Sequence, residues 1–121
     1  MKKTLLWLDD FRNPFTNDWV LRFSPIGEDV IIIWVKTYKD FTSWITTNGL
    51  PDAICFDNDL GDFSTINGEL IEKTGYDCAK WIVEYCLDND KEAPLFNIQS
   101  DNTPAIENIF KLLTNFKNRT K

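Results

Sequence analysis

Short apolar runs, separated by polar or amphipathic segments, are the main pattern along the chain. Three of these runs are continuous and a fourth is interrupted only by Asn97, which is typical of strands covered on both faces in a parallel sheet. They occupy residues 5–8, 30–35, 53–56 and 95–98. The pattern therefore predicts four strands, with the one at 30–35 buried like the others.

Three segments near these runs carry apolar side chains at helical spacing. The first ends at Asn48-Gly49, a typical helix stop, and the last begins at Thr103-Pro104, where Pro suits the first helical turn. Residues 11–29 show no sustained helical period, so a helix there is predicted to be absent or very short. The apolar faces comprise Tyr38, Phe41, Trp44 and Ile45, then Ala79, Ile82, Val83, Cys86 and Leu87, and finally Ile106, Ile109, Phe110 and Leu113.

The connection at 61–75 is long and has a pattern of its own. Asn67-Gly68 lies between alternating residues, and this dipeptide is the strongest short-range hairpin signal. We therefore expect a small flap there. Because the other strands are separated by helices, right-handed parallel crossovers are expected, and the fold class is α/β in a single domain over 1–121.

The amino-acid composition excludes several kinds of functional site. The 121 residues carry a net charge of −6, so no broad basic surface is available for general binding of duplex nucleic acid. The sequence contains no histidine. This excludes Ser-His-Asp and Cys-His nucleophiles, imidazole zinc sites and an imidazole general base.

The cysteines and the length of the apolar runs indicate the cellular compartment. Cys55, Cys78 and Cys86 are odd in number, form no C-x-x-C pair and lie in apolar runs, which favours reduced core thiols. The first apolar run is far too short to span a bilayer. We therefore expect a cytoplasmic protein that does not bind membranes.

Polar side chains follow three of the predicted strands directly. Because the carboxyl ends of parallel strands meet at one edge of the sheet, we expect these side chains to converge there. Packed carboxylates either take up protons or hold a hard divalent cation, and Mg²⁺ or Mn²⁺ suits them best. Arg12 supplies a planar fork for a phosphate. The polar set is Asp9 and Asp10, then Asp57 and Asp59, then Ser100, Asp101 and Asn102.

Each of these features also has a purely structural interpretation. The aspartates serve equally well as turn residues, and Ser100 and Asn102 serve as caps of the last helix. The Trp and Phe side chains are interpreted as core or surface packing without a role in function, since no basic strand accompanies them.

Several motifs together resemble the cyclic-phosphate-processing receiver-like family. They are L-W-L-D-D-F-R-N-P at 6–14, D-N-D-L-G at 57–61, T-G-Y-D at 74–77 with A-K-W-I at 79–82, and Ser100 and Asn102 with E-N-I at 107–109. The similarity spans nearly the whole chain in the right order, and the first two motifs are the most specific.

The resemblance implies a derivative of the response-regulator receiver fold that acts on cyclic phosphates of small molecules or RNA ends. We therefore expect a flavodoxin-like, three-layer domain with about four parallel strands in the order 2-1-3-4. Asp9, Asp10 and Asp57 are the expected metal ligands. The expected catalytic set is Asp57, Asp59, Arg12, Ser100 and Asn102.

Two departures from the family pattern bear on activity. The family usually reads D-H-D-L-G and H-S-x-N, whereas this chain has Asn58 and Gln99 at the two histidine positions. Amides form hydrogen bonds but do not transfer protons near neutral pH. The resemblance therefore predicts a metal-dependent phosphoesterase site with impaired catalysis. The 61–75 connection is also longer than is usual in the family.

Two other functions stay open. One is a non-catalytic module that binds a nucleotide or a protein. The other is a Mg²⁺-dependent phosphoacceptor receiver, which requires a Lys after a fifth strand that the sequence does not provide. For the fold itself, the residues expected in or near the core are Trp7, Ile32, Ile33, Phe56, Ile82, Ile98, Ile109 and Phe110.

Overall fold

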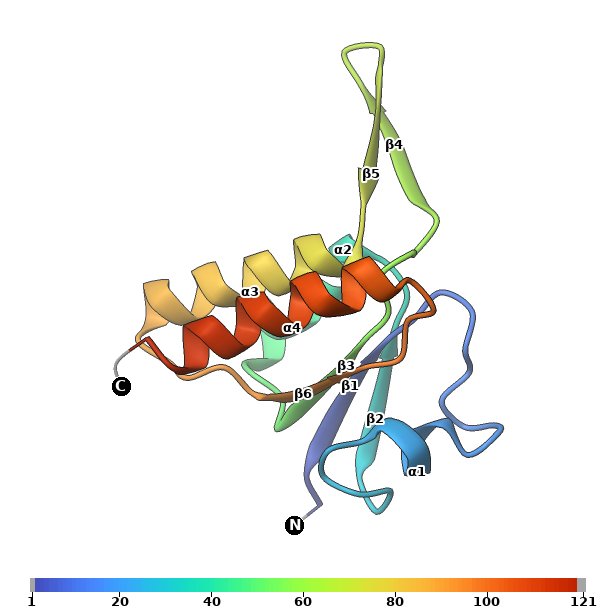
Figure 1. The fold of residues 1–121 in the computed structure, drawn as a ribbon, viewed down its shortest axis with the longest axis vertical. Coiled ribbons are helices and arrows are strands. Elements are labelled where there is room, and N and C mark those ends of the chain that lie inside the picture. The colour runs from blue at the N-terminus through green and yellow to red at the C-terminus, as the bar shows by residue number, and fades with distance from the viewer. Residues whose placement is uncertain (1, 120–121) are drawn as a thin grey trace.

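A four-stranded parallel sheet forms the middle of the molecule (Figure 1). The computed structural model describes residues 2–119, so the ends of the predicted 1–121 domain lie outside the described residues. The strands are β1 (Thr4–Leu8), β2 (Ile31–Val35), β3 (Ala53–Phe56) and β6 (Leu95–Ile98). They pair in the order β2-β1-β3-β6, which confirms the predicted order because β6 is the fourth strand of this sheet.

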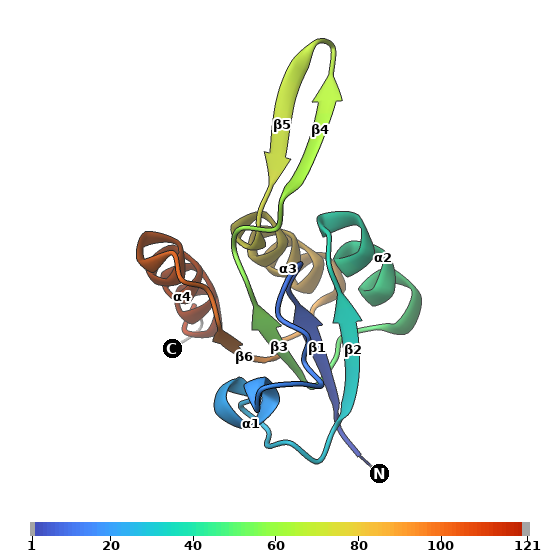
Figure 2. The same ribbon diagram turned by 90° about the vertical axis from the view of Figure 1, so that its right-hand side faces the viewer.

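The helices form two unequal layers (Figure 2). The three longer ones, α2 (Tyr38–Asn48), α3 (Gly75–Asn89) and α4 (Thr103–Lys117), lie on one face of the sheet. The short α1 (Trp19–Phe23) lies on the other. The three-layer α/β arrangement is therefore confirmed, with one layer reduced to α1 and its flanking loops.

Alternation along β1 supplies both halves of the core. Leu6 and Leu8 join the apolar cluster under the three longer helices, whereas Leu5 and Trp7 join the cluster under α1. All four side chains are fully buried. A strand buried on both faces reads as a continuous apolar run, which is why residues 5–8 show no polar alternation.

The connection between β3 and α3 forms an antiparallel hairpin of β4 (Asp62–Ile66) and β5 (Glu69–Lys73). Its two turn residues, Asn67 and Gly68, have φ values of 53° and 81°. Positive φ at both positions is the requirement of a type I′ hairpin turn, which explains the Asn-Gly pair. The predicted flap is confirmed, and it projects far from the domain (Figures 1 and 2).

The prediction of burial fails at the margins of the layers. Phe110, expected in the core, is 55% exposed, and Leu87 of the predicted α3 stripe is 57% exposed. The strand predicted at 30–35 begins at Ile31 and is half-exposed, because β2 is an edge strand. Helical and strand periods identify an apolar face but not whether a neighbouring element covers all of it.

The rest of the predicted core is confirmed. Trp7, Phe56, Ile82, Ile98 and Ile109 are buried. Ile32 and Ile33 are partly buried against the two apolar clusters.

The three cysteines are free and buried, as the sequence indicated. Burial raises the pKa of Cys55 to about 12, and it also raises the pKa of Cys78 and Cys86. These thiols therefore stay protonated near neutral pH and are poor nucleophiles. Over residues 2–119 there is no helix with the length and apolar character needed to cross a membrane.

Candidate metal and phosphate site

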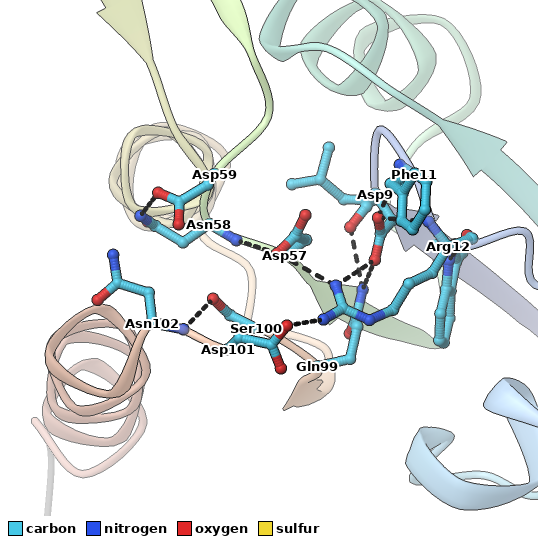
Figure 3. Close-up of polar contacts among 12 residues, drawn as sticks. Asp9, Phe11, Arg12, Asp57, Asn58, Asp59, Gln99, Ser100, Asp101 and Asn102 are labelled. Atoms are coloured by element: carbon cyan, nitrogen blue, oxygen red, sulfur yellow. Dashed lines mark hydrogen bonds and ion pairs between the residues drawn. The ribbon is translucent and has the colours of Figure 1, made fainter.

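The loop after β1 is shaped by the buried side chain of Asp9. Its Oδ1 accepts the backbone N–H groups of Phe11 at 2.9 Å and Arg12 at 2.8 Å, which turns the chain sharply at the end of the strand (Figure 3). Two indoles fix the same loop. Trp7 Nε1 donates to the carbonyl of Arg12 at 2.9 Å, and Trp34 Nε1 donates to that of Asp9 at 2.8 Å.

The loop after β3 is held by the first turn of α3. Gly75 N–H donates to the carbonyl of Asn58 at 2.9 Å, and Tyr76 N–H donates to Asn58 Oδ1 at 3.1 Å. Gly75 permits this approach because it lacks a side chain. An added Cβ there lies 1.8 Å from the carbonyl oxygen of Asp57. The start of α3 thus positions the backbone that carries Asp57.

The loop after β6 brings a third set of polar groups to the same edge. Gln99 is buried, and its Nε2 donates to the Leu8 carbonyl at 3.0 Å, which links β6 to β1. Ser100 Oγ accepts the N–H of Asn102 at 3.0 Å. Asn102 Oδ1 in turn accepts the N–H of Ala105 at 3.1 Å, so Asn102 is the N-cap of α4.

A cavity of about 350 Å³ opens where these loops meet. Five of the seven residues proposed from sequence line it, and Asp9 is buried at the end of the neighbouring strand. Asn102 is not among the lining residues. The lining consists of Asp10, Arg12, Asp57, Asp59 and Ser100, together with Phe11, Trp19 and Asp101.

Three carboxylates at this edge lie close enough to share one cation. Oxygen atoms of Asp9, Asp10 and Asp57 are all within 4.8 Å of one another. Asp9 and Asp57 are buried, whereas Asp10 is exposed and makes no ion pair with residues 2–119. Oxygen ligands of this kind, with one carboxylate open to solvent, fit a hard divalent cation such as Mg²⁺.

Arg12 is held among the carboxylates in this structure. Its Nη1 lies 3.2 Å from Asp9 Oδ2 and 3.6 Å from Asp57 Oδ1, and its Nη2 lies 3.0 Å from Asp101 Oδ2 (Figure 3). The first two partners are buried, but the side chain of Asp101 is 98% exposed. The Nη2 end is therefore the part of the guanidinium whose partner is most easily exchanged.

The acidic surroundings change the titration of Asp57. Burial and the nearby Asp9 and Asp10 carboxylates raise the pKa of Asp57 to about 7, although Arg12 and the N–H of Asn58 act in the opposite direction. A cation bound here would favour the ionised form. Arg12 alone therefore does not balance the negative charge of the carboxylates in this pocket.

The two amides at the family histidine positions act as cross-links. Besides its contact with α3, Asn58 donates through Nδ2 to Asp59 Oδ1 at 3.1 Å. Neither Asn58 nor Gln99 lines the cavity. The sequence did not indicate Phe11 or Trp19 as part of the site. It placed Asp101 at this edge without a role, because its pairing with Arg12 joins residues 89 positions apart.

Comparisons with known proteins agree with this architecture. The model of the family described as "Cyclic-phosphate processing Receiver domain" matches residues 4–115. A solved structure of a fusion protein that carries a segment of the yeast Spc42 trimeric coiled coil has a TM-score of 0.60 and 16% identity. The match covers 93% of this chain and 63% of that one, and it shows the fold alone. A comparison with curated proteins found no match.

Proposed function

The chain belongs to the cyclic-phosphate processing receiver domain family, and from this membership and the geometry of the pocket we propose a metal-dependent cyclic-phosphate site. The site binds Mg²⁺ or Mn²⁺ and, next to it, a cyclic phosphate of a small molecule or an RNA end. Turnover is slow or absent because no histidine is present to move protons. The observation that carries the proposal is the cluster of Asp9, Asp10 and Asp57 oxygens within 4.8 Å.

The carboxylates hold the cation. Asp10 is the exposed ligand and Asp57 the buried one, while both oxygens of Asp9 already accept hydrogen bonds from the loop and from Arg12. A bound divalent cation supplies positive charge that attracts phosphoryl oxygens and stabilises charge that develops on them. Asp10 and Asp57 therefore contribute most to metal affinity, and Asp9 shapes the site.

Arg12 contributes the second positive charge. For its guanidinium to contact a phosphoryl oxygen, Nη2 exchanges the exposed carboxylate of Asp101 for the ligand, while Nη1 keeps its buried partners. The planar fork of an arginine suits this exchange because it presents parallel N–H groups to phosphate oxygens. In this arrangement Asp101 occupies the place of the anion when no ligand is bound.

The proton-transfer step is the weak point of the site. Asp59 lines the cavity and is the carboxylate available as a base, with one oxygen already accepting from Asn58. Ser100 also lines the cavity, whereas Asn102 acts through the helix cap. A missing general acid or base typically lowers the rate by ~10²- to 10⁴-fold, so binding without efficient turnover is expected.

The test combines binding and turnover. Calorimetry with Mg²⁺ and Mn²⁺ measures metal binding to the parent chain and to the Asp10→Asn variant. A panel of 2′,3′-cyclic nucleotides is then assayed with both metals, using the parent, Asn58→His, Gln99→His and the double variant. The expected result is ligand binding in all forms and faster hydrolysis only in the double variant.

Other outcomes contradict specific parts of the proposal. Full activity of the parent chain shows that histidine is dispensable and that the prediction of impaired catalysis is wrong. Absence of any metal response refutes the metal site. Failure of every form to bind a phosphate ligand refutes the cyclic-phosphate site and favours a module that binds protein.

A further inference from the structure

The β4–β5 hairpin is a two-stranded arm that leaves the domain at the edge of the candidate site. It begins directly after Asp59, Leu60 and Gly61, and β5 leads into α3. Its root is anchored, since Asp62 Oδ2 accepts the N–H of Tyr38 at 2.9 Å and Lys73 Nζ lies 4.8 Å from the Tyr38 ring centroid. Beyond the root, the arm projects into solvent (Figure 2).

The arm exposes apolar side chains that a free hairpin does not need. Phe63, Ile66 and Leu70 are 56%, 57% and 69% exposed, and every residue from 63 to 70 is exposed to solvent. Two-stranded hairpins are marginal in water, and three strands are usually needed for a stable sheet. Both outer edges of the arm also carry backbone N–H and C=O groups that a further strand can pair with.

The chemistry of the β5 edge defines what fits beside it. Cross-strand partners share a face, and the register pairs Leu70 with Thr65 and Glu69 with Ile66. Alternation then puts Leu70 and Glu72 on one face of β5, and Glu69 and Ile71 on the other. A strand paired with β5 therefore needs a cation, two apolar residues and a cation in succession. This order is the same in both directions.

We propose that the β5 edge binds an extended segment of a partner protein with a basic-apolar-apolar-basic pattern, which adds a third strand to the arm. Charge complementarity carries the choice of partner, because Glu69 and Glu72 face solvent on the strand. A second copy is disfavoured in the register that keeps the apolar residues of this edge opposite one another. Antiparallel pairing of Leu70 with Ile71 of the other copy puts Glu69 opposite Glu72, and like charges directly opposite are destabilising. The acidic arm equally repels nucleic acid.

The root of the arm connects this surface with the pocket. β4 follows the loop that carries Asp57 and Asp59, and β5 leads into α3, the helix that holds the Asp57–Asn58 backbone. A partner bound along β5 is therefore linked through the root of the arm to the edge where the phosphate is proposed to bind.

The test uses a blocked hexapeptide, Thr-Lys-Val-Val-Lys-Thr, titrated into the ¹⁵N-labelled full chain and followed by amide chemical shifts. Shifts are expected for residues 69–73. The same peptide with Glu in place of Lys, and one N-methylated at both valines, are the probe controls. The variant carrying Glu69→Lys and Glu72→Lys is expected to bind the Lys peptide roughly tenfold more weakly and to prefer the Glu peptide.

A matched control separates edge recognition from net charge. Asp88→Lys with Glu107→Lys changes the charge equally at exposed positions away from the arm, and binding of the Lys peptide is expected to persist. Binding that does not depend on the Glu69 and Glu72 charges, shifts confined to β4, or no binding overturns the proposal. Shifts of residues 69–73 that appear with rising protein concentration alone overturn it in favour of a second copy.

Discussion

Replacement of Gly75 by Ala tests the link between α3 and the site most directly. Helix propensity alone predicts a gain, because Ala is about 1 kcal/mol better than Gly inside a helix. The structure predicts the opposite. The new Cβ lies 1.8 Å from the carbonyl oxygen of Asp57, 2.8 Å from its carbonyl carbon and 3.0 Å from the Cα of Asn58. These neighbours are backbone atoms and cannot rotate away.

The expected loss of stability follows from the backbone atoms that the new methyl group displaces. Relief of the overlap displaces the Asp57–Asn58 backbone by more than an ångström. This movement breaks the two hydrogen bonds that Asn58 accepts from the N–H groups of Gly75 and Tyr76. Overpacking costs about 1–3 kcal/mol and each lost hydrogen bond about 1 kcal/mol. After the propensity gain is subtracted, the free energy of unfolding is expected to fall by about 2–4 kcal/mol.

The assay is urea denaturation with a parallel Mg²⁺ titration. Gly68→Ala is the control, because it adds the same methyl group at a positive φ with no atom within 4 Å. It is expected to cost about 1 kcal/mol of backbone strain and to leave metal binding unchanged. A Gly75→Ala variant that is as stable as the parent, with unchanged metal affinity, would refute the idea that α3 positions Asp57.

Three further predictions concern the pocket. Asp10→Asn abolishes the calorimetric Mg²⁺ signal without lowering the melting temperature, since Asp10 is exposed; retained binding would show that other ligands suffice. Asp101→Asn raises the affinity for a cyclic phosphate up to about fivefold, because Arg12 Nη2 loses a competing exposed partner, and a lower affinity contradicts the exchange. Because the pKa of Asp57 is raised to about 7, the free energy of unfolding is expected to decrease by up to about 1.4 kcal/mol per pH unit as pH rises from about 4 to 7. Urea titrations at several pH values measure this slope, and Asp57→Asn is expected to remove it.

The strands and the hairpin were predictable because local sequence determines them. Ala53–Phe56 and Leu95–Ile98 match the predicted runs, since a short apolar run between turn residues leaves little choice of structure. Asn67-Gly68 fixes the tight turn because both residues adopt positive φ. The exposure of Phe110 was not predictable, because it depends on which side of α4 lacks a neighbour.

The convergence of the site was also predictable, but its internal contacts were not. Parallel topology alone places the ends of β1, β3 and β6 at one edge. By contrast, the contact of Gly75 with Asp57 depends on how closely α3 approaches the sheet. One local signal did exist, because Thr74 and Asp77 have the spacing of a capping box and form one, which fixes the first residue of α3.

The amides at positions 58 and 99 are compatible with a site that retains the three proposed metal ligands. Gln99 Nε2 faces the Leu8 carbonyl and Asp9 Oδ2, two acceptors, so the amide must present its NH₂ group there. Asn58 uses both ends of its amide, one toward Tyr76 and one toward Asp59. Both side chains therefore join the loops that carry the carboxylates. Because these cross-links need hydrogen bonds but no proton transfer, the chain keeps the pocket proposed to bind a cation and a phosphate while the two histidines of the family pattern are absent.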